Sequence, residues 1–308
     1  MSDERPLRLA CIGECMIELS QLDLAGGFAH VGFAGDTLNT AVYLSRLLPG
    51  AVSYVTNLGQ DAFSHRMLQT FALEGIDCSL IGRHQTRLPG IYSIEVDASG
   101  ERSFRYWRDT SAARTLFSGL GASLDDLAAF DVIFLSGITL AILPPEIRVA
   151  LTRRLAELRD AGHQVVFDSN YRPRLWPDAD AARAAFAAMW AASSLALPSF
   201  DDEEKLYPGI TLADVIDRIA ASGVPEIVLK NGADGPMIRY GGHDRQAALP
   251  PAARVVDTTG AGDSFNAGYL ASRLTGADPM TAAAMGHTLA CRVIAHHGAI
   301  IPRAAMPT

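Results

Sequence analysis

The stretch DTTGAGDSFNAGYLASRL, at residues 257–274, places three small residues directly before an aspartate. Gly260, Ala261 and Gly262 leave the backbone uncrowded, and the apolar residues after Asp263 recur at helical spacing. Free N–H groups at a helix start can bind an anion, and glycine lets phosphate oxygens approach closely. Asp263 is then either an ordinary N-cap or a carboxylate that faces a hydroxyl while the amides face a phosphoryl group. In the second case the helix dipole is expected to keep it a weak base.

The composition narrows the class of protein. The chain has 308 residues, of which 49% are hydrophobic and 19% charged, so one large domain with an appendage is expected. The net charge of −8 argues against a general nucleic-acid binder. No stretch approaches the roughly 20 apolar residues that span a bilayer, and MSDERPLRLACIGE contains no signal region. The four cysteines have no metal-site spacing. We expect a cytoplasmic protein.

Apolar runs alternate with helical patterns through most of the chain. Near-continuous apolar strands separated by helices indicate an α/β fold with a mainly parallel sheet covered on both faces. Polar tails follow the strands, and ligands bind outside the carboxyl ends of such strands. The predicted strands are 7–13, 52–59, 131–137, 164–170, 194–199 and 226–232, and the predicted helices are 37–48, 64–75, 144–162 and 179–193.

Two segments, about 15–33 and 88–109, lack the helical period. Within the second, IYSIEVD and ERSFRYWRD alternate like an antiparallel hairpin joined by Ala98–Gly100. A small β appendage of this kind commonly serves as a lid. Because it is built from two insertions, we expect residues 1–308 to form a single domain.

The segment DTTGAGDSFNAG, 257–268, resembles the C-terminal signature of the ribokinase-like (PfkB) carbohydrate kinases nearly position for position. AGDTLNTAVYLSRL, 34–47, resembles the sugar-binding segment of that family, with Ala34–Gly35 where the family often has two glycines. A narrower resemblance is to the members that act on the sugar acid 2-keto-3-deoxygluconate. It lies in GECMIELS, RLPGIYSIE, GERSFRYWR, FDSNYRPRLW and GAIIPRAAMP.

The resemblance implies a ribokinase-like three-layer α/β/α sandwich with a small β lid. It implies ATP-dependent phosphorylation, with Mg²⁺ accompanying ATP, of 2-keto-3-deoxygluconate to 2-keto-3-deoxy-6-phosphogluconate. Asp263 would be the general base, and Gly260, Ala261 and Gly262 would supply an anion hole. The implied substrate-binding residues are Gly35, Asp36, Asn39, Tyr92, Tyr106, Arg108, Arg172 and Asp263. The implied nucleotide-binding residues are Asn170, Ser199, Lys230, Gly232, Gly235, Gly260 and Gly262. The metal ligands stay open, because the acidic residues 201–204 stand where many relatives have Asn-x-x-Glu.

Several of these residues have a structural interpretation as well. Asp36 could cap the helix at 37–48. Tyr92, Tyr106 and Arg108 could simply pack the two strands of the hairpin together. Arg172 could form a surface salt bridge.

The charge of the implied substrate bears on the roles of the two arginines. A sugar acid carries a carboxylate, and arginine offers it a planar bidentate fork, so Arg108 and Arg172 are the candidates. The alternatives are a fructokinase or another sugar kinase, a non-catalytic sugar-acid sensor, and a nicotinamide-dependent oxidoreductase. The last lacks a glycine-rich fingerprint, since CIGECMIE follows the first strand. An exposed lid edge would favour a homodimer formed by two lids.

Overall fold

The computed structural model describes residues 6–96 and 102–307. A central eight-stranded sheet has the order β14-β13-β12-β11-β10-β9-β1-β4. Neighbouring strands are parallel from β4 to β12, whereas β13 and β14 are antiparallel additions at one edge. The strands are β1 (Leu9–Ile12), β4 (Val52–Val55), β9 (Val132–Ser136), β10 (Gln164–Asp168), β11 (Leu195–Ala196), β12 (Glu226–Leu229), β13 (Met237–Tyr240) and β14 (His243–Gln246).

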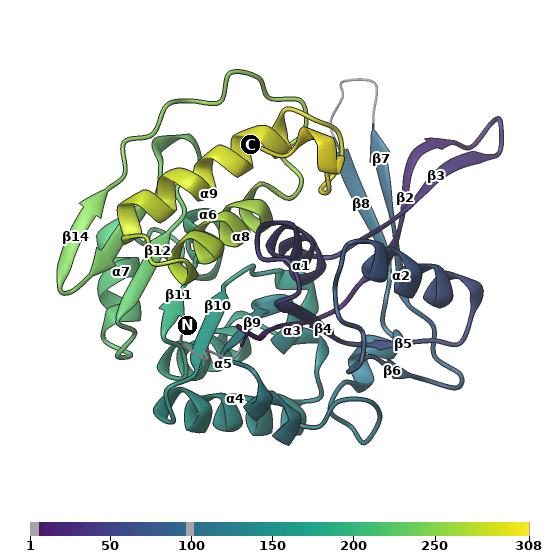
Figure 1. Ribbon diagram of the computed structural model, residues 1–308, viewed down its shortest axis with the longest axis horizontal. Helices are drawn as coiled ribbons and strands as arrows, with labels where there is room; N and C mark the ends of the chain where they lie inside the picture. Colours follow the sequence, from purple (N-terminus) through teal and green to yellow (C-terminus); the bar gives the residue numbers. More distant parts are fainter. Residues whose placement is uncertain (1–5, 97–101, 308) are drawn as a thin grey trace.

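Alternate residues of the sheet enter two separate cores, one on each face. Cys11 of β1 packs in the first core, whereas its neighbours Ala10 and Ile12 pack in the second. The first core is covered by α1 (Asp36–Leu47), α2 (Ala62–Leu73), α8 (Ala261–Leu274) and α9 (Pro279–Ile294). The second is covered by α3 (Gly137–Ile142), α4 (Pro145–Asp160), α5 (Ala179–Ala191), α6 (Phe200–Leu206) and α7 (Leu212–Ala220). The predicted three-layer α/β/α arrangement is therefore confirmed (Figure 1).

A second sheet of four strands, in the order β3-β2-β7-β8, projects from the side of the core (Figure 1). The strands are β2 (Met16–Asp23), β3 (Phe28–Ala34), β7 (Gly90–Val96) and β8 (Arg102–Trp107). β2 pairs in parallel with β7, and the two outer pairs are antiparallel. β7 and β8 thus pair as the hairpin pattern predicts, while the predicted connection at Ala98–Gly100 lies outside the described residues. We call this four-stranded sheet the lid sheet.

The remaining short elements connect these layers. They are β5 (Asn57–Leu58), β6 (Gly82–Arg83) and the 3₁₀ turns η1 (Ala112–Thr115), η2 (Asp125–Ala129), η3 (Pro173–Leu175), η4 (Gly232–Asp234) and η5 (Arg303–Ala305). Within residues 6–96 and 102–307, no helix has the length and apolarity needed to cross a membrane.

Candidate active site

Polar residues from five elements meet at the carboxyl ends of the parallel strands. α1 begins at Asp36, directly after the lid strand β3, and Ser136 and Asp168 end β9 and β10. Lys230 follows β12, and Asp263 lies in the first turn of α8. The sheet topology therefore brings together residues that are far apart in the sequence, as the strand tails predict.

Asp263 is not the N-cap of α8, so that interpretation of the sequence was wrong. The cap is Gly260, which has a φ of 76° and makes no side-chain cap bond, so Asp263 is the third helical residue. A Cβ on Gly260 would lie 2.8 Å from the carbonyl oxygen of Ala299. Both the positive φ and this close approach therefore require glycine at the position. The Ala261 N–H donates to the Thr258 carbonyl at 3.2 Å. The first-turn amides of Gly262 and Asp263 have no acceptor within their helix, and they are the better candidates for an anion hole.

The Asp263 carboxylate is half-buried and accepts a hydrogen bond from Asn39 Nδ2 at 2.7 Å. Burial raises the pKa of Asp263 to about 7, and the negative charge of Asp36 acts in the same direction. The hydrogen bond from Asn39 lowers it, but not enough to offset burial. The expectation of a weak base was therefore wrong, because burial disfavours the charged form of the carboxylate.

Asp36 is held by residues at the ends of two central strands, β9 and β10. Asn170 Nδ2 donates to Asp36 Oδ2 at 2.7 Å, and the Ser136 hydroxyl donates to the same oxygen. α1 starts at Asp36 itself with Gly35 as its cap, so the N-cap interpretation of Asp36 is wrong too. Asn170 has a φ of 29°, an uncommon value that the surrounding contacts must stabilise. Its amide, predicted to approach the nucleotide, thus contacts a residue predicted to bind the sugar.

Lys230 is the centre of a second polar cluster beside α8. Its Nζ lies 3.0 Å from both Asp168 Oδ2 and Asn266 Oδ1, and Asn266 Nδ2 donates to Asp168 at 2.6 Å. A Cβ on Gly262 would lie 3.7 Å from that Nζ, so the cation stands next to the first turn of α8. Sequence reasoning missed Asp168 and Asn266, although both belong to quoted motifs, FDSN and DSFNAG.

The other predicted nucleotide-binding residues flank this cluster. Ser199 pairs with Lys230 in an isolated parallel bridge, and its N–H donates to Ser169 Oγ at 3.2 Å. Gly232 and Gly235 enclose the turn η4 and have positive φ values of 50° and 78°. All three therefore lie on the chain segments next to Lys230.

The lid sheet holds the predicted aromatic residues against acids that sequence reasoning missed. Tyr92 donates from its hydroxyl to Glu18 and stacks on Tyr106 with ring centroids 5.7 Å apart. Arg108 donates to Glu14 and is only 6% exposed. The aromatic stacking fits the strand-packing interpretation, whereas a buried arginine at the edge of the lid needs a further explanation.

Arg172 is the more open of the two candidate arginines. Its side chain is 48% exposed, and its Nη1 donates to the Tyr171 carbonyl at 2.9 Å and lies 3.4 Å from Asp202 Oδ1. Asp202 also lies 3.6 Å from Lys205, and burial raises its pKa. In the part of the chain that the structure describes, no three His, Cys, Asp or Glu residues gather as a metal site would require.

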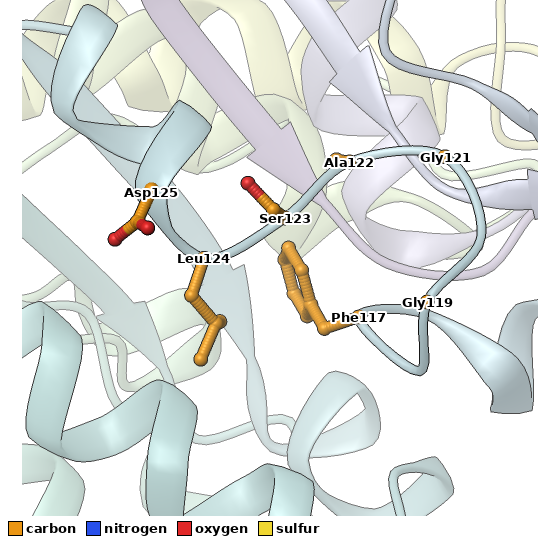
Figure 2. Close-up of a pocket in the computed structure, with 7 residues that line it drawn as sticks. All are labelled: Phe117, Gly119, Gly121, Ala122, Ser123, Leu124 and Asp125. Carbon is orange, nitrogen blue, oxygen red and sulfur yellow. The ribbon is translucent and has the colours of Figure 1, made fainter.

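The structure also has a surface cavity of about 510 Å³ (Figure 2). It is lined by one loop, from Phe117 to Asp125, between the lid sheet and β9. None of the predicted site residues lines it.

The site combines a helix start with uncrowded backbone amides, a nearby lysine and a carboxylate beside an amide side chain, which are features that a small-molecule kinase needs. Residues 7–306 match the family described as pfkB family carbohydrate kinase, and the chain belongs to that family. It is 47% identical over 308 residues to a 2-dehydro-3-deoxygluconokinase of Escherichia coli strain K12, covering 97% of this chain and 99% of that protein.

Solved structures agree on the fold. A PfkB protein from Polaromonas sp. JS666 superposes with a TM-score of 0.82 at 26% identity, over 95% of this chain and 96% of that one. A putative ribokinase II from E. coli, in complex with ATP and Mg²⁺, superposes with a TM-score of 0.81 at 20% identity, over 95% of this chain and 94% of that one.

Proposed function

We propose that this protein transfers the γ-phosphoryl group of ATP to the terminal hydroxyl of 2-keto-3-deoxygluconate, which is also called 2-dehydro-3-deoxygluconate. The single observation that carries the proposal is the position of Asp263. It combines a pKa raised to about 7 with a place in the first turn of α8, beside Lys230. A base with a pKa near neutrality suits proton transfer from a hydroxyl.

The chain's own residues then divide the work. Asn39 orients the Asp263 carboxylate, which accepts the proton of the attacking hydroxyl. The amides of Gly262 and Asp263, together with Lys230, stabilise the charge on the transferred phosphoryl group. Asn170 and Ser136 orient Asp36 toward the sugar hydroxyls.

Mg²⁺ would shield the phosphate charge when it is bound with ATP. Carboxylate oxygens suit this ion, and Asp168 and Asp202 offer them near Lys230, directly or through water.

A panel of sugars and sugar acids offered with Mg-ATP tests the proposal. We expect turnover of 2-keto-3-deoxygluconate to exceed that of fructose and ribose by a wide margin. Comparable turnover of fructose would instead favour a fructokinase and would remove the reason for a carboxylate clamp.

The pH dependence gives a separate prediction. Asp263 has to be ionised to act as a base, so kcat/KM for the sugar acid should rise about tenfold per pH unit below its pKa. The profile should level off near the pKa of about 7. The residual activity of Asp263→Asn is the control, because its profile reports the titration of ATP and of other groups. A wild-type profile that is flat between about pH 5 and pH 8 would contradict the role of Asp263.

We also propose that two copies pair through their lid sheets. Leu24 lies in the turn between β2 and β3, and Phe28 is the first residue of β3. Their side chains are 87% and 72% exposed, which is unusual for large apolar residues. Light scattering should give twice the monomer mass, and Phe28→Glu should restore the monomer. A wild-type protein that is monomeric at micromolar concentration would rule this pairing out.

A further inference from the structure

Glu14 lies where the core joins the lid sheet, in the turn between β1 and β2. It is 1% exposed, and its Oε2 accepts a hydrogen bond from Arg108 Nη2. Arg108 follows the last residue of β8, so the ion pair connects the carboxyl end of a core strand with the end of a lid strand. Both side chains are almost fully removed from solvent.

Two glycines make room for this pair. A Cβ on Gly35, at the start of α1, would lie 2.2 Å from the Glu14 carbonyl oxygen. A Cβ on Gly90, at the start of β7, would lie 2.9 Å from Glu14 Oε1 and 3.0 Å from Arg108 Cβ. Close approach from the core side and from the lid side therefore fixes both the backbone of Glu14 and its carboxylate. A side chain fixed in this way can orient its partner.

The three guanidinium nitrogens of Arg108 have different surroundings. Nη2 donates to Glu14, and Nε is buried without a partner, like Oε1 of Glu14. Within residues 6–96 and 102–307, Nη1 has no hydrogen-bond partner, and it is not among the buried nitrogens. The ion pair thus leaves one edge of the guanidinium available to an acceptor.

We propose that Glu14 is a positioning residue for the sugar acid: it holds Arg108 so that Nη1 donates to the substrate. The proposal rests on the function proposed above. Arginine has five donors, so it can bind Glu14 and a substrate oxygen at the same time. Because Glu14 balances the charge of Arg108, the interaction with the substrate depends on the direction of a hydrogen bond more than on a free positive charge.

The test is the variant Glu14→Gln, which keeps the shape of the side chain and removes its charge. We expect its KM for 2-keto-3-deoxygluconate to rise about tenfold, the scale of one charge-assisted hydrogen bond. The KM for ATP should not change, and kcat should stay within about threefold, because Asp263 and Lys230 are not touched. The double variant Glu14→Gln, Arg108→Ala should be no worse than Arg108→Ala alone in its KM for the sugar acid.

Glu226→Gln is the matched control, since Glu226 is also buried and paired with an arginine, Arg273, but away from the lid sheet. It should change thermal stability and leave both KM values as they are. Additive effects of Glu14→Gln and Arg108→Ala, or equal losses for the sugar acid and ATP, would overturn the positioning role.

The positioning role of Glu14 and the assignment of the substrate can be tested separately. If the wild-type enzyme prefers another sugar, the proposed function fails, and the same KM comparison is made with the preferred sugar. If there is no kinase activity at all, a crystal structure of Glu14→Gln decides. A guanidinium of Arg108 that stays in its wild-type position would refute the proposal, and a displaced one would support it.

Discussion

Asp263→Asn is expected to reduce kcat by about 10²–10⁴-fold, the usual range for loss of a general acid or base. The amide keeps the size of the side chain, and the neighbouring backbone amides of α8 are unchanged. Binding of the sugar acid and of ATP should therefore persist, which calorimetry on the variant would measure. A variant that still transfers phosphate at the wild-type rate would exclude Asp263 as the base. Loss of binding together with activity would indicate a structural role.

The same variant should be more stable than the wild type in alkaline solution. The pKa of Asp263 is raised from 3.8 to about 7, so folding favours its protonated form. That contribution is complete below about pH 4 and is lost as the pH rises through about 7. At about pH 8 Asp263→Asn should gain on the order of 4 kcal/mol over the wild type, and the gain should vanish in acid. Denaturant unfolding at both pH values measures it.

Asp278→Asn is the matched control for both measurements. Asp278 caps α9 and accepts from the amides of Met280 and Thr281. Asparagine caps helices about as well as aspartate, so activity should not change. The hydrogen bonds from Thr281 lower the pKa of Asp278, so any effect of Asp278→Asn on stability should be a loss at pH 8 that disappears in acid, opposite in sign to that of Asp263→Asn.

The sequence predicts the fold well because its signals are local. Every predicted strand contains a strand of the central sheet, since continuous apolar runs such as 131–137 can only be buried on both faces. α3 was missed because its six residues are too few for a helical period to show. The antiparallel strands β13 and β14 were missed as well, because exposed edge residues such as 243–246 carry no apolar pattern.

The candidate site is only partly predictable from the sequence. Asp263 and Lys230 stand in motifs, and the polar tails of the predicted strands place Lys230 at the carboxyl edge of the sheet. Their partners come from distant segments: Asn39 bonds Asp263 across 224 positions, and Lys230 bonds Asp168 across 62. The same holds in the lid, where Arg108 bonds Glu14 across 94 positions. Nothing in the local pattern around Glu14 distinguishes it from an ordinary exposed glutamate. Burial, which raises the pKa of Asp263, likewise depends on the complete fold.

Removal of either candidate arginine should lower kcat/KM for the anionic sugar acid much more than turnover of a neutral sugar. Arg172→Ala is expected to lower kcat/KM for 2-keto-3-deoxygluconate by about 10- to 100-fold, the range of a charge-assisted hydrogen bond to a carboxylate. Turnover of fructose, which lacks the carboxylate, should fall much less. Arg172 is 48% exposed, and the shortest distance between its guanidinium and the Asp202 carboxylate is a long 3.4 Å. Its removal should therefore hardly change the stability of the fold.

Arg108→Ala should also lower kcat/KM for 2-keto-3-deoxygluconate. In addition it should destabilise the fold, because it leaves Glu14 buried without its partner. Breaking a buried pair from one side costs about 3–5 kcal/mol. The double variant Glu14→Gln, Arg108→Ala removes both charges, so it should recover much of that stability without recovering the preference for the sugar acid. Equal losses on both sugars in the Arg108 and Arg172 variants would show that neither residue recognises the carboxylate. A loss confined to the sugar acid would identify the arginine that binds it.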